Sequence, residues 1–156
     1  MSNGRKSKAL LLWIAVLLEM MLIFSLSAQP VSQSNKLSKG VTKTVVETVE
    51  KVSLGMDLST DRLNHIVRKN AHFFTYLILA CFIWMALKKS GMNKYKAFSW
   101  ALLVCVLYAI TDEIHQLFVP GRGSQVKDVL IDSAGAVTGL GLCSVASQIR
   151  RKMKKS

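Results

Sequence analysis

The chain has 156 residues, 51% of them hydrophobic, and its 21 Lys and Arg against nine Asp and Glu give a formal charge of +12. This length allows at most one domain, and the apolar residues cluster in four long runs that mostly lack the polar face of a soluble helical bundle. Because the basic residues flank these runs without an aromatic stacking surface, anionic lipid accounts for them and nucleic acid is excluded as a partner.

The four runs predict an all-α integral membrane protein with a bundle of four transmembrane helices. Each run is close to the ~20 residues that cross about 30 Å of hydrocarbon as a helix. In chain order the predicted segments are a basic tail (1–8), a first span (9–28), an external segment (29–69), a second span (70–87), an internal turn (88–96), a third span (97–117), an external loop (118–128), a fourth span (129–147) and a basic tail (148–156). Residues 9–147 form the one predicted domain.

The distribution of charge predicts the orientation of the bundle. The two tails and the turn 88–96 hold twelve of the 21 basic residues and none of the nine acidic ones. Basic residues concentrate on the cytoplasmic side of membrane proteins. We therefore expect both termini in the cytoplasm, and the segments 29–69 and 118–128 on the extracytoplasmic face.

The first span shares two features with a signal peptide, since basic residues precede it and small residues end it. Its apolar stretch is longer than the core of a signal, and Glu19 lies at its middle, so we expect a retained span. Cleavage would leave three spans with the same outward face. A carboxylate near the midplane is costly, and we expect Glu19 to be protonated or hydrogen-bonded to another span, with a proton relay as the alternative.

The external segment 29–69 contains valines near helical spacing between residues 41 and 52. They predict a short amphipathic helix lying against the outer surface, with Gly55 at its end. Residues 61–70 continue in helical register into the second span. Turns are expected at residues 91–93 and 120–123, where glycine occurs beside asparagine or proline.

Polar residues gather at the outer ends of all four predicted spans. Helical spacing places Arg68, His72 and Tyr76 on one stripe of the second span, and Asp128 and Asp132 on one stripe of the fourth. Ionisable groups at this depth usually face the bundle interior and find partners there. We predict a headgroup-binding site formed by Arg68, His72, Arg122, Ser25 and Gln29, supported by a network of Tyr76, Asp112, Glu113, Gln116, Asp128 and Asp132. The alternative is a set of interface anchors and ion pairs that only fix the packing of the helices.

Small residues and cysteines have simpler explanations. The stripe that includes Gly135 and Gly139 favours close helix packing inside the bundle over a dimer contact, although the oligomeric state stays open. Cys81, Cys105 and Cys143 fall within the spans and are expected to be free thiols. Because no two histidines have a metal-ligand spacing, the sequence predicts neither a metal site nor a cofactor.

The polar residues belong to four motifs, at residues 24–30 (FSLSAQP), 68–76 (RKNAHFFTY), 111–122 (TDEIHQLFVPGR) and 128–135 (DVLIDSAG). Together these motifs resemble the VanZ-like membrane proteins, a family named for a teicoplanin-resistance protein of Gram-positive bacteria. Asp132 stands where asparagine is expected as often, which adds an acid to the predicted site. The resemblance implies a multi-span bundle in a bacterial cell membrane and an association with lower susceptibility to a glycopeptide antibiotic. It implies no particular biochemical activity.

Three kinds of function fit these features. The first is a protein that binds the headgroup of an anionic lipid or a lipid-linked cell-wall precursor, with Arg68 and Arg122 on the phosphate. The second is an intramembrane enzyme that cleaves or transfers a phosphate or acyl group, with His72 as base or nucleophile and Asp112 or Glu113 as acid or orienter. The third is a small transporter or a folding partner of a larger complex, although no inverted repeat supports transport. We favour binding.

Overall fold

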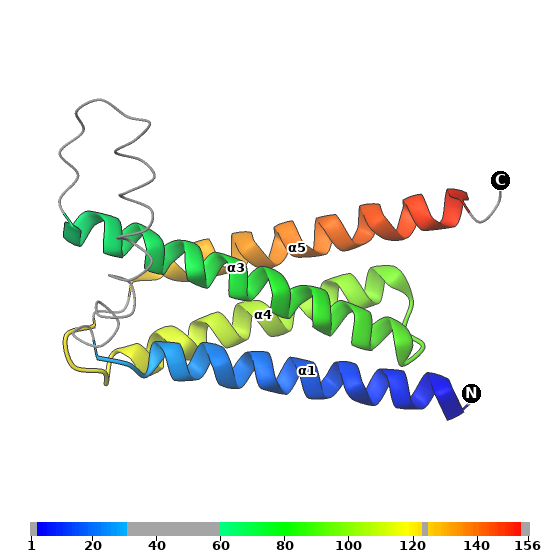
Figure 1. Ribbon diagram of the computed structural model, residues 1–156, viewed down its shortest axis with the longest axis horizontal. Helices are drawn as coiled ribbons and strands as arrows, with labels where there is room; N and C mark the ends of the chain where they lie inside the picture. Colours follow the sequence, from blue (N-terminus) through cyan, green and yellow to red (C-terminus); the bar gives the residue numbers. More distant parts are fainter. Residues whose placement is uncertain (1–2, 31–59, 123–124, 154–156) are drawn as a thin grey trace.

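The computed structural model describes residues 3–30, 60–122 and 125–153, and within them the chain is an all-α bundle (Figure 1). Its helices are α1 (Asn3–Ser27), α3 (Thr60–Lys89), α4 (Lys94–Gln116) and α5 (Val126–Met153), and these described residues contain no strand. The predicted fold class is therefore confirmed. The amphipathic helix expected between residues 41 and 52 lies outside the described residues.

Each helix contains a stretch that is long and apolar enough to cross a membrane. These stretches are Lys6–Ser27, Ile66–Lys89, Lys94–Gln116 and Val126–Met153. Large apolar side chains such as Leu17, Leu103 and Leu130 are exposed on the outside of the bundle, where hydrocarbon rather than water suits them. The prediction of four membrane-spanning helices is confirmed. Helices α3 and α5 extend beyond the predicted spans at both ends, and α1 and α4 at their starts, because the flanking polar residues continue the same helical turns.

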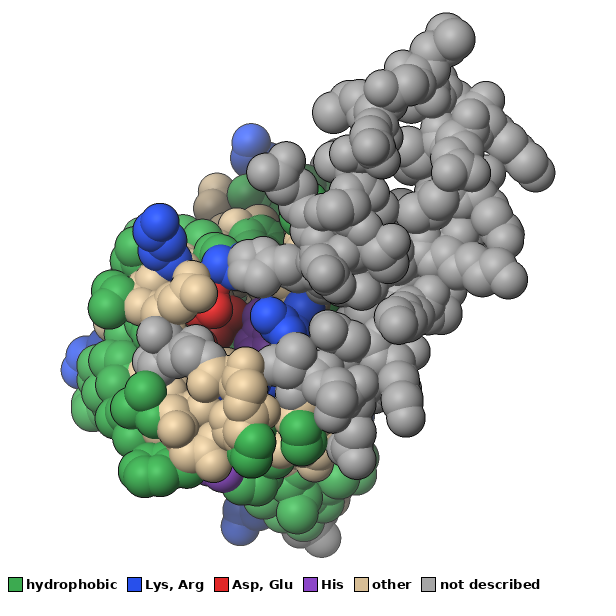
Figure 2. All heavy atoms as spheres, turned by 90° about the vertical axis from the view of Figure 1, so that its left-hand side faces the viewer, with side chains coloured by type: hydrophobic (Ala, Val, Ile, Leu, Met, Phe, Trp, Pro, Cys, Tyr) green, Lys and Arg blue, Asp and Glu red, His purple; other side chains and the backbone are tan. Residues whose placement is uncertain are grey.

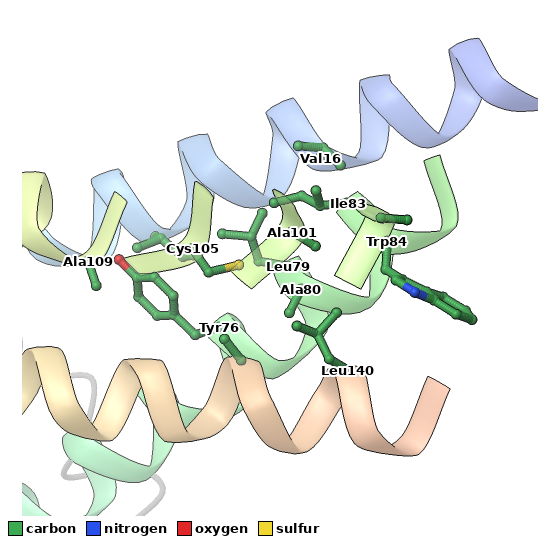
Figure 3. Close-up of a cluster of buried hydrophobic side chains, with 13 residues drawn as sticks. Val16, Tyr76, Leu79, Ala80, Ile83, Trp84, Ala101, Cys105, Ala109 and Leu140 are labelled. Carbon is green, nitrogen blue, oxygen red and sulfur yellow. The ribbon is translucent and has the colours of Figure 1, made fainter. Parts of the chain in front are cut away.

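The core of the bundle forms around α3, which packs against all three other helices (Figure 3). Tyr76, Leu79 and Ile83 are fully buried on one side of α3. The facing side of α4 presents small residues at steps of four, including Ala101 and Cys105, which are also fully buried. Small side chains let helices approach closely in lipid, where van der Waals packing drives their association.

Helices α5 and α3 approach each other closely at two glycines. A Cβ atom built on Gly135 would overlap the carbonyl oxygen of Phe73, and one on Gly139 would overlap that of Leu77. The Sγ of Cys81 also donates a hydrogen bond to the carbonyl oxygen of Gly139, at 3.3 Å. The two glycines therefore pack inside the bundle, as predicted, and they hold the start of α5 against α3.

Two turns connect the described helices, and both use a glycine with positive φ. Gly91 has φ +102° between α3 and α4, and Gly121 has φ +77° after α4. Asn93 caps the start of α4, where its side chain accepts a hydrogen bond from the backbone N–H of Tyr95 at 3.0 Å. Glycine adopts this backbone conformation without the steric cost that other residues meet. Both turns lie where the sequence predicts them.

The start of α1 and the end of α5 lie at one end of the bundle, together with the turn between α3 and α4 (Figure 1). The charge pattern predicts that this end is cytoplasmic. In a variant without the three native cysteines, we expect Val126→Cys to react with a membrane-impermeant thiol reagent on intact bacterial cells. Ser90→Cys should react only after permeabilisation, because it belongs to the opposite end.

The cysteine-free parent protein is the control for this labelling experiment, since it should take up no reagent in either state. Both tested positions are exposed in the structure, so a difference in labelling reports the side of the membrane rather than burial. Labelling of Ser90→Cys alone on intact cells would reverse the predicted orientation.

Candidate functional site

Charged side chains gather in the middle of the bundle at the end opposite the start of α1 (Figure 2). Here acidic, basic and histidine side chains lie together, with hydrophobic side chains visible on the outer side of the bundle. They surround a cavity of about 180 Å³, which is lined by Arg68, Lys69, His72, Glu113, Gln116, Gly121, Arg122, Gln125, Asp128, Ile131 and Asp132. The structure thus brings residues of α3, α4, α5 and the turn before α5 around one space.

Asp112 is held beside this cavity by two hydrogen bonds. The hydroxyl of Ser27 donates to Asp112 Oδ2 at 2.7 Å, and the amide of Gln116 donates to the same oxygen at 3.1 Å. All three side chains are buried. The contact joins the last turn of α1 to α4, while the other carboxylate oxygen, Oδ1, is buried and accepts no hydrogen bond from the described residues.

His72 lies between two buried carboxylates that come from different helices. Its Nδ1 is 4.0 Å from Asp112 Oδ2 and 3.8 Å from Asp132 Oδ1, and both separations are too long for a hydrogen bond. Asp132 is fully buried, and neither of its oxygens accepts a hydrogen bond from the described part of the chain. One donor atom from each residue lies within 4.8 Å of the others, so the three could hold a metal ion.

An ion pair between α3 and α5 lies at the mouth of the cavity. Lys69 Nζ is 2.7 Å from Asp128 Oδ1, with the two side chains 24% and 26% exposed. Asp128 also belongs to the first turn of α5, where the helix dipole favours an anion. Partial solvent exposure makes such a pair worth little stability, so its main effect is to neutralise Lys69.

Two arginines also line the cavity, and their surroundings differ. Arg122 Nη2 donates a hydrogen bond to the carbonyl oxygen of Leu26 at 2.9 Å, which attaches the turn before α5 to the end of α1. Burial lowers the pKa of the Arg122 guanidinium, and the nearby positive charge of Arg68 lowers it further. Arg68 is half-buried and makes no hydrogen bond or ion pair with any residue that the structure describes.

Glu113 connects α4 to the start of α5. Its Oε2 accepts a hydrogen bond from the backbone N–H of Gln125 at 2.9 Å, just before the first residue of α5. The first N–H groups of a helix have no partner within the helix, so an acceptor at this place fixes where the helix begins. This contact gives Glu113 a structural role in shaping the cavity.

Several predicted residues lie elsewhere. Ser25 is exposed and donates to the carbonyl oxygen of Met21 in its own helix, at 2.7 Å, so it does not join the cluster. Gln29 is half-buried and is not among the residues that line the cavity. Tyr76, by contrast, is fully buried in the bundle core close enough to Asp112 and Asp132 for their charges to act on its hydroxyl, and its ring centre is 6.2 Å from that of Tyr108. Glu19 is only partly buried, in the middle of α1 and away from the cluster.

Ser27 takes the place that the sequence suggested for Ser25. The buried side of α1 runs through Val16, Ile23 and Ser27. A span that is apolar all round gives no indication of which side faces its neighbours, so spacing alone could not choose between the two serines. The only available signal was that Ser27 lies eleven positions beyond Val16 and four beyond Ile23, and it is weak.

A comparison with protein families finds a match over most of the chain. A family model described as VanZ/LLP1 matches residues 12–147, a range that contains every residue lining the cavity. Neither the curated proteins nor the solved structures that were compared match the chain. With four helices of membrane-spanning length, this match shows a multi-pass membrane protein. The chain belongs to the VanZ/LLP1 family.

Proposed function

We propose that this protein binds the anionic headgroup of a membrane lipid or of a lipid-linked cell-wall precursor, at the extracytoplasmic face of a bacterial cell membrane. The observation that carries the proposal is Arg68, a half-buried guanidinium that lines the cavity without a hydrogen bond or ion pair to the described residues. An unpaired cation that faces a polar cavity at the membrane boundary favours an anionic ligand.

The charges around the cavity favour a phosphate in particular. Lys69 is already paired with Asp128, which leaves Arg68 as the lining cation that has no hydrogen bond or ion pair to the described residues. Arg122 lines the same cavity and adds a second positive charge beside it. They are close enough for the charge of Arg68 to affect the pKa of Arg122. Two neighbouring guanidiniums repel each other unless an anion lies between them, and their planar forks match the oxygens of a phosphate.

The size of the cavity supports a headgroup as the ligand. Its volume of about 180 Å³ is below the range of roughly 300–1,000 Å³ that is usual for drug-sized ligands. A phosphate with a small substituent fits such a space, while the acyl or prenyl chains remain in the bilayer. A headgroup held there would change how lipophilic glycopeptide antibiotics reach their targets, and lower susceptibility to them is the expected consequence.

The test is lipid retention by the full-length protein in nanodiscs formed with total envelope lipids. Mass spectrometry of the purified discs should show one class of anionic lipid enriched on the protein. Arg68→Ala should reduce that enrichment by ten-fold or more, because a charge-assisted hydrogen bond contributes about 1.5–3 kcal/mol. Since Arg68 makes no hydrogen bond or ion pair with the described residues, the variant should assemble normally.

Lys127→Ala is the matched control for this experiment. Lys127 is an exposed cation on the first turn of α5, at the same end of the bundle, and it does not line the cavity. Its loss should leave the enrichment unchanged. Equal losses in the two variants would indicate general attraction to the basic surface, and the absence of any enriched anionic lipid would reject the proposal.

The alternative function is an intramembrane enzyme that acts on the same class of lipid. The arrangement of His72 between Asp112 and Asp132 favours it, because a histidine oriented by carboxylates is suited to general-base catalysis. The same mass spectra distinguish the two functions. A new lipid or phosphate product that disappears with His72→Ala, while Arg68→Ala removes binding, would establish catalysis.

A further inference from the structure

We infer that His72, Asp112 and Asp132 form a binding site for a divalent transition metal ion of the Zn²⁺ or Mn²⁺ class. The three residues come from α3, α4 and α5, so no spacing within one helix indicates the site. The inference goes beyond headgroup binding and does not depend on it. It rests on the geometry of the three side chains, on their buried oxygens and on the chemistry of the donors.

The geometry leaves room for an ion between the side chains. The donor atoms lie within 4.8 Å of one another, and His72 Nδ1 is 3.8 Å from Asp132 Oδ1 and 4.0 Å from Asp112 Oδ2. Ligands at about 2.0–2.1 Å from a tetrahedral zinc ion are roughly 3.4 Å from one another. The observed separations are too long for direct hydrogen bonds and longer than those between the ligands of a bound ion, so the side chains must move toward the ion to close the site.

The buried oxygens point independently to a missing partner. Asp132 is 0% exposed, and neither of its carboxylate oxygens accepts a hydrogen bond from the described residues. Oδ1 of Asp112 is also buried and accepts no hydrogen bond from the described residues. The Nδ1 of His72 lies 3.8 Å from Oδ1 of Asp132, beyond hydrogen-bonding distance. Buried oxygens without partners are costly, and a dication would satisfy them and neutralise both carboxylates.

The surroundings of Asp112 resemble the second layer of contacts around a metal site. Ser27 and Gln116 both donate to its Oδ2, which fixes the orientation of the carboxylate. Outer hydrogen bonds of this kind orient metal ligands and commonly change affinity by about 10–100-fold when they are removed. Asp112 is therefore held in place before an ion arrives.

The donor set selects the class of ion. One imidazole nitrogen and two carboxylate oxygens suit Zn²⁺, Mn²⁺ or Fe²⁺, whereas Ca²⁺ prefers a larger set of oxygens and Cu⁺ prefers sulfur. Three protein ligands leave at least one position open. Because His72 and Asp132 line the cavity, that position is accessible to water or to an anionic oxygen.

The experiment uses the full-length protein in nanodiscs of phosphatidylcholine, stripped of metal with a chelator and then titrated with Zn²⁺. We expect one zinc ion per chain after desalting, measured by elemental mass spectrometry. Asp132→Asn and His72→Ala should each weaken binding by ten-fold or more. Co²⁺ in place of Zn²⁺ should give the visible absorption of a nitrogen–oxygen site, and this absorption should be lost in Asp132→Asn.

Asp128→Asn is the matched control, since it makes the same chemical change one turn earlier in α5, where the carboxylate pairs with Lys69 instead. Its zinc affinity should stay within two-fold of that of the unmodified protein. Helical circular dichroism and elution volume verify that each variant is folded. Absence of a stoichiometric ion in the folded, unmodified protein would overturn the inference, and so would equal losses in Asp132→Asn and Asp128→Asn.

The choice of lipid separates this test from that of the proposed function. The phosphatidylcholine headgroup carries no net charge, so zinc binding in these discs does not depend on an anionic lipid, and its loss in Asp132→Asn and His72→Ala assigns it to the three side chains. Failure to bind zinc would leave the lipid-retention experiment with Arg68→Ala unaffected. Conversely, a lipid-retention experiment that finds no enriched anionic lipid would leave a measured metal site valid.

Discussion

Gly135→Ala is expected to destabilise the bundle by about 3 kcal/mol, because its new methyl group would overlap the backbone of α3. The carbonyl oxygen and carbon of Phe73 are the first atoms that the methyl group meets, and backbone atoms cannot rotate away as a side chain can. The helices must therefore separate. Thermal unfolding followed by circular dichroism in nanodiscs measures the change.

Gly141→Ala is the control for this substitution, because it lies on the same helix and its added Cβ meets nothing within 4 Å. Alanine favours a helix over glycine by ~1 kcal/mol, so this variant should be equally stable or slightly more stable. Similar losses in the two variants would mean that the close approach of α5 to α3 contributes little to stability.

The close packing at Gly135 also positions Asp132 beside His72. Gly135 lies less than one turn beyond Asp132 on the buried side of α5, so any separation of the helices there moves Asp132 away from His72. The close packing of α5 on α3 is therefore what places the two side chains within reach of one ion. We expect Gly135→Ala to lose zinc affinity together with stability.

When metal has been removed, Asp112→Asn is expected to lower the free energy of unfolding, whereas Asp132→Asn is not. Asp112 accepts hydrogen bonds from Ser27 and Gln116. Neutralising the carboxylate weakens both bonds, which should lower the free energy of unfolding by about 1–2 kcal/mol. Asp132 accepts no hydrogen bond from the described residues. Removing its charge should therefore leave stability unchanged or raise it by up to about 1 kcal/mol.

Unfolding of the two variants in chelator, within the same nanodiscs, measures this contrast. The two substitutions are chemically identical and both positions are buried, so the unmodified protein is a sufficient reference. An equal loss in Asp132→Asn would show that Asp132 already has a strong partner, such as a protonated His72. That result would also remove the main support for the metal site.

The sequence by itself determined the features that depend on local rules. The length and apolarity of the runs determine four spans, and glycine or asparagine at Gly91, Asn93 and Gly121 determines the turns. Helical spacing likewise places His72 one turn from Arg68, and Asp132 one turn from Asp128. These relations hold for any helix, whichever neighbours it meets, and so they could be predicted without a structure.

Only the tertiary structure decided which residues of different helices meet. The rotation of α1 turns Ser27 rather than Ser25 toward Asp112, and the approach of α5 to α3 brings Asp132 within 3.8 Å of His72. The cap that Glu113 forms on α5 also depends on the packing of two helices. Such contacts follow from the rotation and crossing of spans that are apolar on nearly every side, a pattern that does not specify which side is buried.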